Sequence, residues 1–150
     1  MTAKIRAKQR SKAVRALRRI PGGVHRVKVG LTGGANPYPD GTSVIDVGIL
    51  NEFGAAGVPE RSFLRAGIRE GKPEYRKMNR RNLKAITRGD KTAKQALGEL
   101  GLKAQGDVQE MIAEVSTPPN APATIARKGS ANPLVDTGHM RQSITHEVIK

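Results

Sequence analysis

The chain has 150 residues, a length typical of one domain with its own buried core. It has no cysteine, which excludes disulfides, thiolate metal sites and cysteine nucleophiles. Lys and Arg number 27 against 13 Asp and Glu, and the formal net charge of +14 favours a polyanionic partner or an acidic protein surface. No apolar run approaches the roughly 20 residues that span a bilayer, and the basic N-terminus lacks the apolar stretch of a signal peptide. We therefore expect a soluble protein that stays in the cell that makes it.

The charge is banded along the sequence. Residues 1–31 carry ten Lys or Arg and no acid, and residues 61–94 carry twelve against three acids. Residues 32–60 carry four acids and no Lys or Arg, and residues 95–126 carry four acids and one Lys. The basic bands could line a surface that faces nucleic acid, or opposite bands could dock between neighbouring copies. A solvated helix face is the third interpretation of each band.

The N-terminal segment predicts a basic helix. Residues 3–20 contain strong helix formers without Gly or Pro, and Ala13, Leu17 and Ile20 fall on one stripe. Pro21-Gly22-Gly23 ends this pattern. We divide the chain into a basic helical arm at 1–21 and a single α+β domain at 22–150. The basic side chains of the arm that could face DNA or a partner include Lys4, Arg6, Lys8 and Arg10.

Period-two alternation predicts three strands. Residues 24–31 place Val27, Val29 and Leu31 on one face, and residues 42–49 alternate in the same way. The Gly- and Pro-rich stretch 33–41 between them predicts a hairpin with a long tip, and residues 50–54 a turn or helical end. Residues 142–149 predict a closing strand.

Two helical regions lie between the second and third predicted strands. The first begins after Ser62 as N-cap, and we expect Pro73 to break or restart it. Its exposed face carries four basic residues that could meet DNA or a partner: Arg76, Lys77, Arg80 and Arg81. Residues 92–115 place apolar side chains every three to four positions, which predicts a long amphipathic helix that ends before the prolines at 118–122. The predicted fold is therefore α+β, a small antiparallel sheet packed against this helix.

The sequence shows no constellation typical of an enzyme. The three histidines, His25, His139 and His146, lack metal-ligand spacing, and no serine sits in a nucleophile motif. A nuclease-like acidic cluster of Asp40, Asp46, Glu52 and Glu60 is the least favoured alternative, because no lysine follows at short spacing. We expect no enzymatic activity, no metal and no cofactor. Any nucleic-acid contact would involve phosphates alone and depend steeply on salt.

Two segments resemble a known family. The first reads Gly48-Ile-Leu-Asn-Glu-Phe-Gly54 and then Val58-Pro-Glu-Arg-Ser-Phe-Leu-Arg65. The second comprises Pro118-Pro-Asn-Ala-Pro-Ala-Thr124, Arg127-Lys128-Gly129 and Pro133-Leu-Val-Asp-Thr-Gly-His-Met-Arg-Gln-Ser-Ile144. These blocks resemble the neck and tail-completion proteins of tailed bacteriophages, also called virion morphogenesis or Z-type proteins. The likeness covers about residues 45–150, with Ser62 in place of the usual Pro and Met140 in place of a frequent Leu.

The chemistry of the residues in these blocks separates them into two groups. Aromatic burial would anchor the first block to the core, and a tight turn would direct the last strand. These structural residues are Phe53, Gly54, Pro59, Phe63, Leu64, Asp136, Thr137 and Gly138. Arginines and a lysine that project from the blocks would serve interfaces between subunits. These are Arg61, Arg65, Arg127, Lys128 and Arg141.

Membership of this family implies a structural virion protein. Its rings, most often hexamers, lie between the head–tail connector and the tail terminator or tail tube, and packaged DNA passes through the bore. The implied partners are copies of the chain, connector or adaptor proteins, the terminator or tube, and DNA, without a membrane. The implied location is the virion neck, assembled in the host cytoplasm. A tail terminator and a DNA-binding accessory protein stay open as alternatives.

Overall fold

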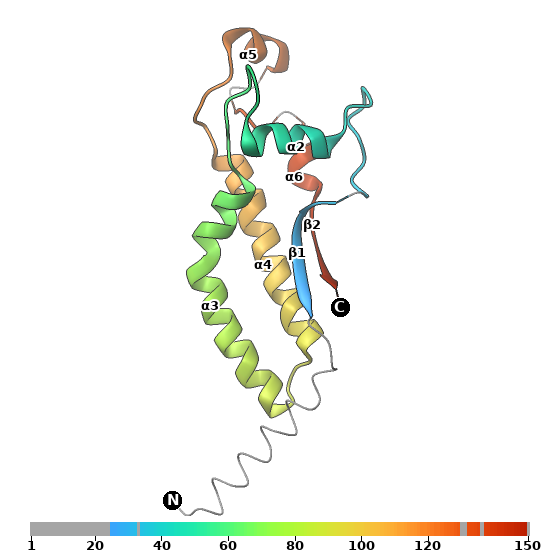
Figure 1. The fold of residues 1–150 in the computed structure, drawn as a ribbon, viewed down its shortest axis with the longest axis vertical. Helices are drawn as coiled ribbons and strands as arrows, with labels where there is room; N and C mark the ends of the chain where they lie inside the picture. Colours follow the sequence, from blue (N-terminus) through green and yellow to red (C-terminus); the bar gives the residue numbers. More distant parts are fainter. Residues whose placement is uncertain (1–24, 33, 130–131, 136, 150) are drawn as a thin grey trace, which may run out of the picture.

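The computed structural model describes residues 25–32, 34–129, 132–135 and 137–149, without the side chains of Arg127 and Lys128. The predicted basic arm at 1–21, with Lys4, Arg6, Lys8 and Arg10, lies outside the described residues, as does Asp136. The described part is an α+β fold, as predicted (Figure 1).

A long helix forms the centre of the fold. Helix α4 (Ala93–Glu114) lies between helix α3 (Leu64–Arg88) and a two-stranded antiparallel sheet (Figure 1). The sheet pairs β1 (Arg26–Leu31) with β2 (Ile144–Ile149), so that Arg26 faces Ile149 and Leu31 faces Ile144. Two of the three predicted strands, the first and the last, are confirmed, and so is the predicted packing of the sheet on a long helix.

Three shorter helices complete the described part. Helix α2 (Val44–Phe53) crosses the end of the sheet, and α6 (His139–Gln142) leads directly into β2. Helix α5 (Pro122–Lys128) lies beyond α2 at the far end of the molecule (Figure 1). The core sits where α2, α4, α6 and the sheet meet. Its buried side chains include Val44, Phe63, Val108, Ile112, Leu134, Met140 and Ile144.

Local signals explain the position of α4. Thr92 and Gln95 form a capping box at its start, in which each side chain accepts from the other residue's backbone N–H. Gly101 lets the helix approach the sheet closely, since a Cβ atom there would lie 2.5 Å from His146 and 2.7 Å from Val27. The helix therefore needs glycine at this contact.

The second predicted strand, at 42–49, is wrong, and so is the predicted hairpin. These residues enter α2, whose first turn is capped by the Ser43 hydroxyl, which accepts from the Asp46 N–H. Val44, Gly48 and Glu52, four residues apart, form the buried face of this helix. Strand β1 pairs instead with β2, which comes from the other end of the chain.

Two details of α3 also differ from prediction. The helix continues through Pro73, whose exposed position leaves the unpaired Arg69 carbonyl open to water. Ser62 does not cap it: Phe63 occupies the cap position, and the Ser62 hydroxyl donates to Glu52. The predicted break at 88–90 is confirmed, because Gly89 ends the helix in the left-handed conformation.

Candidate functional site

The carboxylate of Glu52 caps a helix that is remote in sequence. One of its oxygens accepts from the backbone N–H groups of Phe63 (2.9 Å) and Leu64 (2.8 Å), and the other from that of Arg65 (3.0 Å). The first N–H groups of a helix have no partner within it, and a negative charge there also meets the positive end of the helix dipole. Glu52 therefore joins the end of α2 to the start of α3, and its side chain is buried.

Two opposing effects set the charge state of Glu52. Burial raises its pKa, but hydrogen bonds from Arg65, Leu64 and Ser62 to the carboxylate outweigh burial, so the pKa lies below its ordinary value. The group is consequently a fixed negative charge at neutral pH, with its lone pairs occupied.

Arg65, a predicted interface residue, is largely engaged within the chain. Its Nε donates to the Glu52 carboxylate at 2.8 Å, and a terminal nitrogen donates to the Glu52 carbonyl and to Glu60, both at 2.7 Å. Its guanidinium also lies 4.8 Å from the ring centre of Phe53. Phe53 itself is 61% exposed, so the prediction that its ring is buried as an anchor is wrong.

Arg61, the other predicted interface arginine of this block, does not project from the surface. It is only 6% exposed, and it donates from Nε to the Pro118 carbonyl (2.7 Å) and from a terminal nitrogen to the Pro119 carbonyl (2.9 Å). Burial lowers its pKa, although the guanidinium stays charged. Arg61 thus links the two sequence blocks that carry the family resemblance.

The remaining residues of the first block shape the loop before α3. Gly54 adopts a positive φ of 73°, and a Cβ there would lie 3.0 Å from the Glu60 backbone nitrogen. The loop then closes through the Ala55–Val58 bridge, with Pro59 exposed. Phe63 is buried at 2% exposure and Leu64 packs against the core, as predicted.

The second block supplies core residues and a turn. Gly138, with a φ of 77°, precedes the short helix α6, and Thr137 beside it is exposed. Arg141 is exposed on α6. Arg127 and Lys128 lie on α5, and their predicted interface role stays a prediction.

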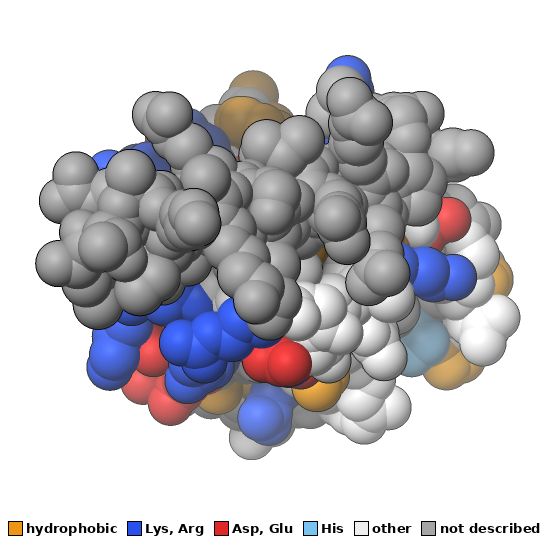
Figure 2. Space-filling view, turned by 90° about the horizontal axis from the view of Figure 1, so that it is seen from below, with side chains coloured by type: hydrophobic (Ala, Val, Ile, Leu, Met, Phe, Trp, Pro, Cys, Tyr) orange, Lys and Arg blue, Asp and Glu red, His pale blue; other side chains and the backbone are white. Residues whose placement is uncertain are grey.

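The outer face of α3 is basic. Arg76, Lys77, Arg80 and Arg81 are all exposed, as their predicted role requires. Lys77 lies 3.5 Å from Glu74, whereas the other three have no ion pair among the described residues. Viewed from the end where α3 joins α4, Lys and Arg side chains gather beside a few carboxylates (Figure 2).

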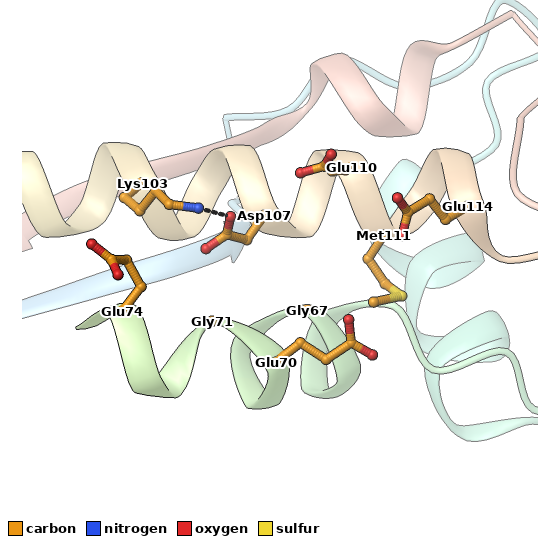
Figure 3. A pocket seen from close by; sticks show the side chains of 9 residues that line it. All are labelled: Gly67, Glu70, Gly71, Glu74, Lys103, Asp107, Glu110, Met111 and Glu114. Carbon is orange, nitrogen blue, oxygen red and sulfur yellow. Dashed lines mark hydrogen bonds and ion pairs between the residues drawn. The ribbon is translucent and has the colours of Figure 1, made fainter. Parts of the chain in front are cut away.

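A groove between α3 and α4 has the opposite charge. Gly67 and Gly71 let the helices approach, and the groove has a volume of about 310 Å³ (Figure 3). Lys103 pairs with Asp107, which also accepts from the Tyr75 hydroxyl at 2.8 Å. The groove is lined by five carboxylates and one lysine: Glu70, Glu74, Asp107, Glu110, Glu114 and Lys103. The molecule therefore separates positive and negative charge onto different surfaces of one helical hairpin.

The acidic residues weighed for a nuclease do not form a metal site. Glu52 and Glu60 share Arg65, and Asp40 accepts from the Thr42 N–H at 2.9 Å. Within the described residues, no group of three or more His, Cys, Asp or Glu side chains could hold a metal ion. In the same part of the chain, no helix is both long and apolar enough to cross a membrane.

The sequence interpretation missed the role of Glu52 and the acidic groove. An available signal for Glu52 was its position four and eight residues after Gly48 and Val44, which places it on the buried face of a helix. The apolar Phe63 at the cap position of α3 likewise indicates that the cap comes from elsewhere.

Comparisons with protein families, curated proteins and solved structures find no match to this chain.

Proposed function

We propose that this protein is a structural subunit of a tailed-phage virion that forms a ring with its own copies at the joint between head and tail. The observation that carries the proposal is the contact between the two resembling blocks. Arg61 of the first block holds the backbone of Pro118 and Pro119 in the second, over 57 and 58 residues of sequence. This contact supports treating the blocks as one unit.

The distribution of charge supports association between copies. The exposed arginines of α3 form a positive surface, while acidic side chains lie in the α3–α4 groove and in residues 32–60, which contain no Lys or Arg. Such surfaces fit head-to-tail contacts, which close into a ring when the rotation between neighbours allows it. The proposed partners are the head–tail connector, the tail terminator or tail tube, and DNA in the bore, with assembly in the host cytoplasm and no enzymatic role.

Electron microscopy of the purified full-length protein tests the proposal. We expect rings in negative stain, and a ring at the top of the tail when the protein is added to tails that lack it. Because ion pairs between exposed surfaces are screened, we expect ring formation to weaken as salt rises. A chain that stays monomeric at high concentration and is missing from purified particles would contradict the proposal.

A DNA-binding accessory protein is the second candidate. It is favoured by Arg76, Arg80 and Arg81, which are exposed and have no ion pair among the described residues. It predicts duplex binding by the monomer that is lost on Arg80→Ala and Arg81→Ala substitution, with a steep dependence on salt. A tail terminator, the near alternative within the structural class, would differ by its position on isolated tails.

A further inference from the structure

Helix α2 has large apolar side chains on the side that faces away from the core. Asp46, Ile49, Leu50 and Phe53 lie at helical spacing and are all exposed, with Ile49 at 51% and Phe53 at 61%. The opposite face, with Val44 and Gly48, is buried. Large apolar side chains that gather on an exposed surface commonly mark an interaction site. The outer face of α2 is here called the α2 patch (Asp46, Ile49, Leu50 and Phe53); Arg65 lies against Phe53, and the three apolar side chains stay at least 42% exposed.

An open apolar groove adjoins the α2 patch. It has a volume of about 190 Å³, and β1, α2 and the start of α3 line it. Its lining includes Val29, Leu31, Ile49, Phe53 and Leu64. The groove and the patch together form one apolar surface that a protruding aliphatic side chain could enter.

The border of this surface is acidic. Residues 32–60 contain four acids and no Lys or Arg. Two of these acids are exposed here: Asp46 belongs to the patch, and Glu60 pairs with Arg65, which lies against Phe53. The nearest arginine, Arg65, is already engaged by Glu52 and Glu60. A partner for this surface therefore needs an apolar centre with positive charge around it.

The chain carries such a surface on α3. Leu83 is 54% exposed, and Arg76 and Arg80 lie seven and three residues before it on the same face of the helix. Leu83 lies 19 residues beyond Leu64, which adjoins the groove, so the helix separates the two by about 29 Å. The two surfaces cannot meet within one molecule, but they can meet between two.

We propose that the α2 patch and groove of one copy receive the Leu83 face of α3 from a second copy. The aliphatic side chain of Leu83 enters the groove, while Arg76 and Arg80 approach Asp46 and Glu60. Because the two surfaces differ, each copy offers one of each, and the contact repeats around a ring. This inference rests on the proposed function, since it identifies the interface of the proposed ring.

Cysteine cross-linking of the full-length protein tests this contact, and the absence of native cysteines leaves no background. Ile49→Cys and Leu83→Cys are each made alone and together, at exposed positions that leave the core intact. Under mild oxidation, we expect a mixture of the Ile49→Cys protein and the Leu83→Cys protein to form a covalent dimer. We expect the double variant to form a ladder of larger covalent species. Ile49→Cys with Leu102→Cys is the matched control, because Leu102 is 62% exposed on α4. We expect at least tenfold slower cross-linking in that pair.

Each other outcome overturns the inference in an identifiable way. Oligomers in light scattering without a 49–83 cross-link would refute this interface and leave the proposed function standing. A persistent monomer that is missing from particles would refute both. Slow reaction of Ile49→Cys with a thiol reagent in the monomer would show that the chain covers its own α2 patch. If duplex DNA slowed the reaction of Leu83→Cys with the thiol reagent and no 49–83 cross-link formed, the α3 face would be assigned to DNA.

Discussion

The Glu52 carboxylate accepts the Nε–H of Arg65 at 2.8 Å, while the Glu52 backbone carbonyl accepts a second N–H from the same guanidinium at 2.7 Å. Glu52 belongs to the last turn of α2, and Arg65 to the first turn of α3. The two residues fix the angle at which one helix follows the other. They also hold the α2 patch in place beside the groove.

Removing the Glu52 carboxylate should destabilise the protein strongly. Glu52→Ala leaves the first N–H groups of α3 and the Arg65 side chain without their partner, at an expected cost of about 3 kcal/mol in the free energy of unfolding. Chemical denaturation measures this. The control is Glu60→Ala, which removes an exposed carboxylate and should cost at most about 0.5 kcal/mol. Equal effects of the two substitutions would contradict the capping role.

Acid should weaken the fold through the same carboxylate. The pKa of Glu52 in the folded protein lies below its ordinary value of 4.5, because the hydrogen bonds to the charged form outweigh burial. Its contribution to stability is therefore complete above the pKa of the unfolded chain and is lost as the pH falls through the folded pKa. As the pH is lowered below about 4.5, we expect the urea concentration at the unfolding midpoint to decrease. We expect a smaller decrease in Glu52→Gln. If the urea midpoint of Glu52→Gln depended on pH as steeply as that of the wild-type protein, this would count against the lowered pKa of Glu52.

Arg61 should act within the subunit. Arg61→Ala removes both hydrogen bonds to the prolines, and we expect a loss of about 3 kcal/mol together with faster hydrogen exchange at 116–121. Arg69→Ala, at an exposed position of α3, should change neither quantity. If Arg61→Ala instead left exchange unchanged and weakened self-association, the residue would serve an interface, as the sequence predicts.

Two glycines of α4 form a matched pair. Gly101→Ala should cost about 1–3 kcal/mol, since the new methyl group overlaps His146 and Val27. Gly98→Ala meets nothing within 4 Å and should stabilise the helix by about 0.8 kcal/mol through its better helix propensity. Thermal unfolding separates the two. Stabilisation by both substitutions would show that the sheet can move away from α4.

Elements with strong local signals could be predicted from the chain itself. Helix α4 combines a capping box with a regular apolar stripe, and β1 and β2 each alternate over six residues. The segment that became α2 was ambiguous, because Val44, Ile45, Val47 and Ile49 suit a strand by alternation and a helix face equally well. Its cap at Ser43 and its burial against the core decided for the helix.

The candidate site could be predicted only in part. The exposed arginines of α3 follow from their position on the polar side of a helical stripe. The internal roles of Arg61 and Arg65 did not follow, because their partners lie on the Pro118–Pro119 segment and on α2, whose positions depend on the folded core.

From the sequence alone came the α+β class, the long central helix, the two segments that form strands and the banding of charge, because periodicity, caps and composition act over a few neighbouring residues. The tertiary structure decided which strand pairs with β1, which carboxylate caps α3 and which apolar side chains of α2 stay outside. Those outcomes depend on contacts between residues that are distant in the chain, and no local pattern encodes them.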